Sequence, residues 1–415
     1  MTATYSGEFL GCKVSRTDLE VLRERLAAEG LEEVASAGDV HVVNGCCVTQ
    51  EAVRKTRQSV RQALARSADG VVVVTGCAAN LPGAALADLG PRVHVVRGPA
   101  ERAPGTVVDL LRGLGCRGGR PHDAAAARVR AFLRVQDGCS FRCAFCVIPQ
   151  VRGATRSRPL DEVVAEAERR VAAGHRELVV TGVNVGLYRD RTAGARLPGL
   201  LERLGRVEGL ERLRLSSIEV DHVDDALVAA LARTPAWLPH LHVPLQSGSD
   251  DVLRRMRRRY GRERYLARVE RAREALGDVQ VTADVIVGYP GETDDDFAAT
   301  LDVVERAGLA RVHAFPYSPR PGTATEGADD VPPAVKRHRS AAVRALAERQ
   351  GGARRAARLG QRDRVLVERR DASGALLGYG RDYTPWRVAG AAEPGEIVDV
   401  VAVAASADGL EGRIA

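Results

Sequence analysis

The 415-residue sequence is poor in aromatic residues, which make up only 4% of it, and it contains no long apolar run. A membrane-spanning helix needs about 18 consecutive apolar residues, so we expect no membrane partner. The first residues, MTATYSGEFLG, contain neither the basic nor the apolar region of a secretory signal. We therefore expect a cytoplasmic protein. Hydrophobic residues still reach 45%, enough for buried cores, and the length predicts about two to four domains.

The net charge of +7 and the isoelectric point of about 9.1 come mainly from arginine. Such a charge suits an anionic partner such as RNA, although a GC-rich genome also produces chains rich in arginine and alanine. The sequence contains eight cysteines. In a cytoplasmic protein of this size, that number favours metal or redox chemistry over disulfide bonds.

Strand-like and helical patterns alternate from residue 1 to about residue 110. The predicted strands are residues 7–11, 40–45, 71–76 and 92–98, and the predicted helices include residues 17–30 and 51–67. Alternation of this kind predicts a parallel α/β sheet.

Three cysteines of this segment directly follow strands. Cys12, Cys46 and Cys77 each come one residue after a glycine at the end of a predicted strand. Because the carboxyl ends of parallel strands share one edge of a sheet, the three thiols should converge there. We interpret them as the ligands of a metal cluster, with ordinary unliganded cysteines as the alternative. Cys47 is interpreted as a neighbour without a ligand role, and Cys116 is assigned no role.

Six further strand patterns lie between residues 130 and 320, at 130–136, 177–183, 212–218, 240–246, 281–288 and 311–318. Helical patterns separate them, and six such βα units predict a complete or partial parallel barrel, with an open doubly wound sheet as the alternative. A long helix after residue 333 leads into short alternating runs that predict a small antiparallel β module. We expect domains at residues 1–112, 129–355 and 356–415, with a linker at 113–128.

The segment DGCSFRCAFCVIP, residues 137–149, follows the first barrel strand. Cys139, Cys143 and Cys146 are separated by three and then two residues, and no fourth cysteine follows. Three thiolates can hold three irons of a 4Fe–4S cluster and leave the fourth iron open for a small ligand. A structural zinc ion, the alternative, needs a fourth Cys or His to complete its tetrahedron. The spacing therefore predicts a cluster with one open iron.

Eight motifs, spread over nearly the whole chain, carry a family resemblance. They are, in order, FLGCKVS, VVNGCCVT, VVTGCAAN, VQDGCSFRCAFCVIPQVRG, LVVTGVNVG, HLHVPLQSGSDDVLRRMRRRY, DVIVGYPGET and FPYSPRPGT. Together they resemble the radical S-adenosylmethionine (SAM) methylthiotransferases, whose central domain is a partial (β/α)6 barrel. The last module of the chain is similar to the TRAM domain, a small RNA-binding β-barrel.

The resemblance implies two 4Fe–4S clusters and SAM as cofactors. The expected catalytic residues, which would hold the cluster that reduces SAM, are Cys139, Cys143 and Cys146. The second cluster, which carries the sulfur, would be held by Cys12, Cys46 and Cys77. The cofactors carry the radical chemistry, while the protein positions them and excludes water.

The resemblance also implies SAM contacts at the ends of two barrel strands. Thr181, Gly182 and Asn184 end the second strand and are expected near the amino group of SAM. Gly288 and Gly291 are expected to let the backbone approach its adenine or ribose. A tight strand-to-helix turn would also need glycine at these two positions.

The GCKV motif resembles the branch that acts on N6-threonylcarbamoyladenosine beside the anticodon. Gly45 and Ser15 depart from the residues common in the family, which are Thr and Asn. The resemblance implies methylthiolation at C2 of this nucleoside, with the tRNA anticodon stem-loop as partner and flavodoxin or ferredoxin as electron donor. The alternatives are isopentenyladenosine in tRNA, an aspartate of a ribosomal protein, or an iron–sulfur RNA-binding protein without catalysis.

Several other residues have an RNA-binding and a structural interpretation. The arginine-rich stretches 254–264 and 354–370 are predicted phosphate contacts. Tyr379, Tyr383 and Trp386 would either stack on bases or fill the core of the last module. His240 and His242 share one face of a strand and are interpreted as structural.

Overall fold

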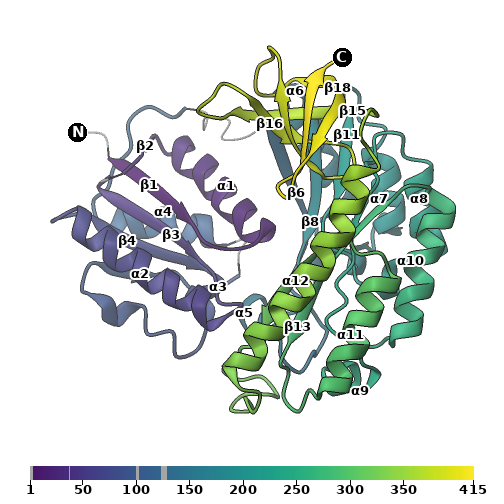
Figure 1. Cartoon of the computed structure of the whole chain (residues 1–415). Helices are drawn as coiled ribbons and strands as arrows, with labels where there is room; N and C mark the ends of the chain where they lie inside the picture. Colours follow the sequence, from purple (N-terminus) through teal and green to yellow (C-terminus); the bar gives the residue numbers. More distant parts are fainter. Residues whose placement is uncertain (1–2, 37, 100–101, 123–128) are drawn as a thin grey trace. The chain divides into compact units, whose positions relative to one another are not determined.

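The computed structural model describes residues 3–36, 38–99, 102–122 and 129–415 (Figure 1). They form two compact units that do not follow the order of the chain. The first combines the described part of Met1–Ala126 with Asp137–Arg156 and Ser318–Ala328. The second combines the described part of Ala127–Gln136 with Ser157–Tyr317 and Asp329–Ala415. Within these ranges, every helix is too short or too polar to cross a membrane.

A five-stranded parallel sheet forms the centre of the first unit and confirms the predicted α/β fold (Figure 1). Its strand order is β2-β1-β3-β4-β5. The strands are β1 (Thr4–Phe9), β2 (Glu32–Glu33), β3 (Val40–Gly45), β4 (Val71–Gly76) and β5 (Val93–Val95). The helices are α1 (Lys13–Ala28), α2 (Gln50–Arg66), α3 (Cys77–Asn80), η1 (Ala87–Leu89), α4 (Ala103–Gly113) and α5 (Ile148–Arg152). Part of the predicted linker, residues 123–128, lies outside the described residues.

Local sequence explains where the two long helices of this sheet begin and end. In α1, Leu19, Leu22 and Leu26 recur at helical spacing and are buried, so one stripe of the helix packs into the core. Gly30, with φ of 78°, reverses the chain after this helix. The hydroxyl of Thr49 accepts a hydrogen bond from the Ala52 amide at 3.1 Å and caps α2. These helix-ending and helix-capping residues set where α1 and α2 begin and end, so that each following strand enters the sheet in the same direction as the one before it.

Six parallel strands of the second unit form the predicted barrel in two sheets, ordered β11-β8-β6-β7 and β12-β13-β14. The strands are β6 (Arg130–Asp137), β8 (Glu177–Gly182), β11 (Arg212–Leu215), β12 (His240–His242), β13 (Gln280–Val287) and β14 (Arg311–Pro316), with the two-residue β7 (Arg156–Ser157), β9 (Arg189–Asp190) and β10 (Ala195–Arg196) beside or between them. The intervening helices are α6 (Leu160–Ala172), η2 (Val185–Leu187), α7 (Leu197–Leu204), η3 (Val220–His222), α8 (Asp225–Ala232), α9 (Asp250–Arg255), α10 (Arg262–Leu276) and α11 (Asp294–Arg306). Parallel bridges Leu213–Trp237 and Ser217–His242 connect the two sheets.

Alternate residues of these strands have different surroundings. On β13, Val281, Ala283 and Val285 lie in the core that also contains residues of the surrounding helices. Thr282 and Asp284 lie between them in the strand and therefore face the opposite, inner side of the partial barrel. The inner side is polar at these positions, whereas the outer side is aliphatic.

The last helix, α12 (Pro333–Ala356), leads into a closed five-stranded barrel, which agrees with the predicted TRAM-like module (Figure 1). Its strands are β15 (Arg362–Arg370), β16 (Leu376–Tyr379), β17 (Pro385–Ala389), β18 (Ile397–Ala405) and β19 (Leu410–Ile414). Four pairs are antiparallel, as expected, but β17 and β19 pair in parallel and thereby close the barrel. Trp386 is 2% exposed and belongs to this core, which supports the structural interpretation of that residue.

A buried charge cluster connects the closed barrel to the partial barrel within the second unit. Glu177 is fully buried and forms ion pairs with Arg212 at 2.7 Å and Arg214 at 2.9 Å. Arg212 also donates to the backbone carbonyl oxygens of Tyr379 and Gly380, both at 3.1 Å. Burial alone would raise the pKa of Glu177, but the Arg214 and Arg212 guanidinium groups lower that pKa to about 2.

We expect Glu177→Gln to destabilise the protein by about 3–5 kcal/mol, because it leaves buried guanidinium groups without their counter-charge. The folded pKa of Glu177 lies below the ordinary value of about 4.3. The stabilisation is therefore complete above about pH 4.3 and is lost as the pH falls towards the folded pKa. Urea denaturation of wild type and variant between pH 3 and pH 7 measures both effects.

The matched control is Glu168→Gln, which removes an exposed carboxylate from α6 and should change the free energy of unfolding little. Equal stability of the Glu177 and Glu168 variants would show that the buried cluster does not support the fold.

Candidate active site

Three of the predicted cluster cysteines lie at one edge of the first sheet. Cys12 follows β1, Cys46 follows β3 and Cys77 follows β4, and these strands are neighbours in the sheet. The Cβ of Cys46 lies 3.7 Å from the position that a Cβ would occupy on Gly11, next to Cys12. The structure therefore brings these cysteines together, as the strand-end pattern predicts.

A glycine lets two of these strands end side by side. Gly76 pairs with Gly45 across β4 and β3 and has φ of 82°. A Cβ at Gly76 would lie only 2.2 Å from Oδ1 of Asn44, so no larger residue fits without displacing that side chain. Cys77, the next residue, is thereby directed into the buried edge of the sheet.

The two adjacent cysteines after β3 differ in their surroundings. Cys47 is fully buried, while Cys46 is partly exposed. A hydrogen bond between Cys47 and Cys77, together with the Arg152 guanidinium, lowers the pKa of the Cys77 thiol to about 6 against the effect of burial. The same hydrogen bond raises the pKa of Cys47. Cys77 is thus the more acidic of the two thiols and the one that more readily gives the thiolate, the form that binds metals.

Arg152 is the most connected polar residue of this region. Its side chain is 4% exposed, and it donates from Nε to Sγ of Cys77 at 3.0 Å. It also donates from Nη1 to Asp137 at 3.0 Å and from Nη2 to Asp18 at 2.5 Å. Asp137 stands two residues before Cys139. One guanidinium group thus connects the Cys77 strand end with the start of the second cysteine loop.

The second cysteine loop follows β6 and belongs to the same compact unit. Gly138 has φ of 67°, and a Cβ there would lie 2.1 Å from the carbonyl oxygen of Ala154. The amide of Cys139 donates to the carbonyl of Gly153 at 3.0 Å, and the amide of Cys146 donates to that of Cys143 at 3.1 Å. These bonds hold the loop closed while all three thiols stay partly exposed.

Two buried arginines, Arg152 and Arg320, were not predicted as site residues from the sequence. Both lie in the motifs that carry the resemblance. Arg320 is 4% exposed and interacts electrostatically with Cys47 and Cys46. Its Nε is buried and has no hydrogen-bond partner among the described residues. An arginine directly after a cysteine loop is the signal that could have pointed to Arg152.

The predicted SAM contacts lie in the second unit. Thr181 and Gly182 end β8 and are buried, and the amide of Asn184 donates to Oε1 of Gln136 at 2.8 Å. The Oδ1 of Asn184 is buried without a hydrogen-bond partner among the described residues, so it is available to a ligand donor.

Gly288 and Gly291 lie in the turn after β13. They have φ of 69° and 71°, and a Cβ at Gly288 would lie 2.4 Å from the Lys336 side chain. The turn itself therefore requires glycine at these positions.

Two family models match the chain. The radical SAM superfamily model matches residues 133–304, and the model of the uncharacterized protein family UPF0004 matches residues 4–98. The threonylcarbamoyladenosine tRNA methylthiotransferase MtaB of Bacillus subtilis is 36% identical over 364 residues, or 83% of this chain and 80% of that protein. The chain belongs to the radical SAM methylthiotransferase family.

Another relative of this methylthiotransferase is named for a different nucleoside. The tRNA-2-methylthio-N(6)-dimethylallyladenosine synthase of Sphingopyxis alaskensis is also 36% identical, over 92% of this chain and 90% of that protein. Among solved structures, the radical SAM methyltransferase TsrM of Kitasatospora setae has a TM-score of 0.58 at 18% identity, covering 78% of this chain and 77% of that chain. This likeness supports the fold.

The cofactors of this methylthiotransferase are SAM and two 4Fe–4S clusters. The residues of the first unit fit such clusters, because each cysteine set offers three thiols and leaves one iron open. Arg152 and Arg320 supply buried positive charge next to the thiols after β3 and β4. Arg152 already pairs with Asp18 and Asp137, whereas Arg320 forms no ion pair with a carboxylate among the described residues, so a negatively charged cluster would balance the charge of Arg320.

We expect anaerobically reconstituted protein to bind about eight irons, four for each three-cysteine site. The triple variant Cys139→Ala/Cys143→Ala/Cys146→Ala should retain about four. Iron and sulfide analysis measures both values. Cys47→Ala is the control and should keep all eight, because Cys47 is not one of the six predicted ligands. A triple variant that binds no iron, or still binds eight, would contradict the two-site assignment.

We expect Arg152→Gln to lower the reduction potential of the cluster beside Cys77, because a hydrogen bond and a positive charge at a cluster sulfur stabilise the reduced state. Arg152→Lys, which keeps the charge, should lower the potential less. The measurement is a redox titration followed by electron paramagnetic resonance, in the background that lacks Cys139, Cys143 and Cys146.

Arg61→Gln, on the exposed face of α2, is the matched control and should leave this potential unchanged. If the reduction potential of Arg152→Gln equals that of Arg61→Gln, the contact between Arg152 and Cys77 does not affect the potential of the cluster.

Proposed function

We propose that this enzyme inserts a methylthio group at C2 of N6-threonylcarbamoyladenosine in the anticodon stem-loop of tRNA. When bound, the clusters and SAM supply the radical, the sulfur and the methyl group. Cys139, Cys143 and Cys146 are proposed to hold the cluster that binds SAM. Cys12, Cys46 and Cys77 are proposed to hold the other. The names of the relatives, several of them tRNA methylthiotransferases, support tRNA as the substrate.

The observation that carries the choice of nucleoside is the polarity of the inner side of the partial barrel. On β12, β13 and β14, this side presents His242, Asp284 and His313 beside one another. A threonylcarbamoyl group offers a carboxylate, a hydroxyl and amide groups to such partners. An isopentenyl group offers no polar atom to these residues, so it would cover them from water without giving a hydrogen bond in return. The polar wall therefore favours the threonylcarbamoyl substrate.

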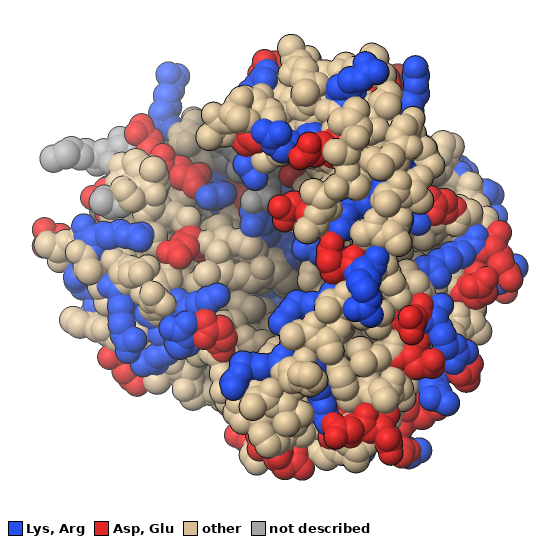
Figure 2. All heavy atoms as spheres, viewed as in Figure 1, with Lys and Arg blue, Asp and Glu red and all other residues tan. Residues whose placement is uncertain are grey.

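The surface of α2 supports binding to a nucleic-acid backbone. The helix carries five cationic residues, Arg54, Lys55, Arg57, Arg61 and Arg66, against the single carboxylate of Glu51. Figure 2 shows Lys and Arg side chains gathered over this helix. Arg54 and Lys55 pair with Glu51, and Arg57 donates to backbone carbonyls. The exposed Arg61 and Arg66 have no carboxylate partner among the described residues and suit phosphate contacts.

The arginine-rich stretches 254–264 and 354–370, which the sequence predicts as phosphate contacts, have more carboxylate partners than the cations of α2 have. Arg258 pairs with Glu219, Arg358 with Asp363 at 2.8 Å, and Arg364 with Glu211 at 3.1 Å. A cation that already has a carboxylate partner contributes less to phosphate binding. We therefore place α2 ahead of residues 254–264 and 354–370 as a tRNA contact surface.

Three further parts of the proposal rest on the family resemblance. Thr181, Gly182, Asn184, Gly288 and Gly291 are proposed to contact SAM. Flavodoxin or ferredoxin is proposed as the electron donor, and the cytoplasm as the place of the reaction. Methylthiolation of isopentenyladenosine or of a ribosomal protein aspartate remains the competing function.

Purified enzyme, supplied with SAM, reductant and a sulfur source, should methylthiolate tRNA that bears threonylcarbamoyladenosine. It should leave tRNA that bears isopentenyladenosine unchanged, because the prenyl group offers no hydrogen-bond partner to the polar inner wall. Mass spectrometry of the digested nucleosides measures both products. The Cys143→Ala variant is the control without activity. Modification of the isopentenyl substrate alone, or of a ribosomal protein alone, would overturn the substrate assignment.

A further inference from the structure

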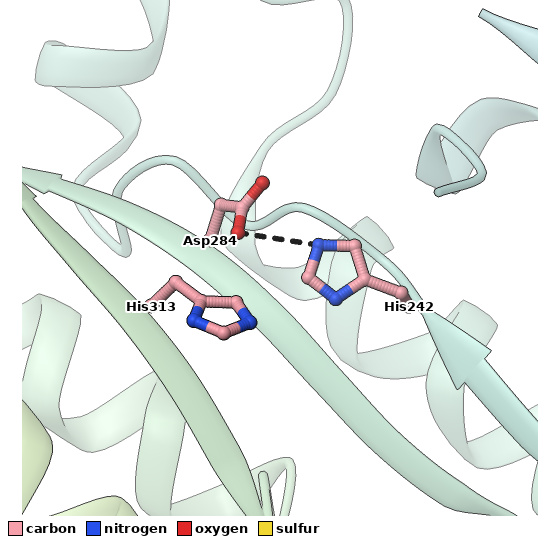
Figure 3. Close-up of side chains that lie close together, drawn as sticks. All are labelled: His242, Asp284 and His313. Carbon is pink, nitrogen blue, oxygen red and sulfur yellow. Dashed lines mark ion pairs between the residues drawn. The ribbon is translucent and has the colours of Figure 1, made fainter. Parts of the chain in front are cut away.

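His242, Asp284 and His313 form a cluster of possible metal ligands that includes none of the six predicted cluster cysteines. They lie on three adjacent parallel strands of the second unit, β12, β13 and β14. Asp284 and His313 are direct partners in the β13–β14 register, and His242 pairs with Thr282, two residues before Asp284. Figure 3 shows the three side chains on the same side of the sheet.

The three residues can present their ligand atoms to one point. One nitrogen of each histidine and one carboxylate oxygen of Asp284 all lie within 4.8 Å of one another. Nε2 of His242 lies 3.2 Å from Oδ1 of Asp284, and the two histidine rings have centroids 5.9 Å apart. We propose that this cluster binds one divalent transition-metal ion, such as zinc or ferrous iron.

The donor set selects the class of metal. Imidazole nitrogen suits zinc, iron, nickel and copper, whereas magnesium and calcium prefer sites made of oxygen ligands alone. Two histidines and one carboxylate are also a common set for metals that keep open coordination positions. The site has no thiolate, so it differs from the cysteine sites in the metals it favours.

Hydrogen bonds outside the cluster orient the His242 ring. Its Nδ1 lies 2.9 Å from the hydroxyl of Thr282, and the same hydroxyl lies 3.0 Å from Nε2 of His240. One hydroxyl can donate to one ring and accept from the other. Nδ1 of His242 is thus occupied, and Nε2 is the atom directed at Asp284. Metal-binding histidines are oriented in this way by partners at their second nitrogen.

The cluster is accessible from the inner side of the partial barrel. The His242 side chain is 11% exposed, that of Asp284 is 28% exposed, and His313 is exposed. Three protein ligands leave positions for water or for an oxygen of another molecule. The structure therefore matches a site with exchangeable ligands better than a closed structural site, and His242 gains a role beyond the structural one expected from the sequence.

The alternative is an ion pair between protonated His242 and Asp284, with His313 as a neighbour that contacts the substrate. In that arrangement the His242 Nε2 atom carries a proton and has no lone pair for a metal. Metal binding and the ion pair therefore exclude each other, and an experiment can separate them.

The test uses the full-length enzyme with both clusters reconstituted and then treated with a chelating resin, so that iron stays in the cysteine sites and other bound iron is removed before zinc is added. After gel filtration, mass spectrometry of the elements counts zinc and iron separately. We expect about one zinc per chain in the wild type. His313→Ala and Asp284→Asn should lose this zinc and keep the iron, because neither residue belongs to a cysteine site.

Two further variants complete the design. His338→Ala removes an exposed histidine from α12 and should keep the zinc. Thr282→Val keeps all three ligands but removes the hydroxyl that orients His242, so zinc affinity should fall about 10- to 100-fold. Unchanged iron content in every variant shows that the fold is intact.

Absence of bound zinc in the wild type, or equal zinc in the wild type, His313→Ala and Asp284→Asn, would overturn the proposal. If zinc is absent while His313→Ala raises the KM for tRNA, the cluster is a substrate contact and the metal assignment is wrong. Neither result depends on which tRNA nucleoside is modified, so failure of this inference is distinct from failure of the proposed function.

Discussion

The hydrogen bonds of one buried guanidinium group, that of Arg152, hold the first unit together at its chemical centre. This side chain contacts Cys77 at one strand end and Asp137 at the entrance of the second cysteine loop. A buried cation is costly unless its partners are in place. Displacement of either cysteine segment would therefore leave the charge unpaired. The mutual placement of the Cys77 edge and the Cys139 loop depends on this interaction.

Glu177 has a corresponding role in the second unit. A single buried carboxylate there pairs with Arg212 and Arg214, which also bind backbone carbonyls of the closed carboxyl-terminal barrel. Aliphatic packing against the helices stabilises the outer side of the strands. On β13, the polar residues Thr282 and Asp284 lie on the inner side instead.

Relatives with two different substrate names have the same identity to this chain, 36%. Overall similarity therefore identifies the family and does not separate the two substrates. Discrimination between a threonylcarbamoyl and a prenyl group depends on a few side chains that contact that group.

The sequence by itself determined the order of strands and helices, the strand ends at Cys12, Cys46 and Cys77, and the three-cysteine loop. These features depend on local hydrophobic periodicity and on turns that need glycine, which a short window of sequence contains. It did not reveal the parallel β17–β19 pair, because pairing between distant strands leaves no local pattern.

Only the tertiary structure showed how the surroundings of Cys46 and Cys47 differ, since burial and the hydrogen bond to Cys77 depend on packing between strands. The same holds for Arg152, which lies 75 residues from Cys77 in the sequence. His242, Asp284 and His313 likewise come from three separate strands, and strand register alone places them beside one another. Charge pairing and ligand geometry involve residues that are far apart in the sequence, so only the folded structure places these residues beside one another.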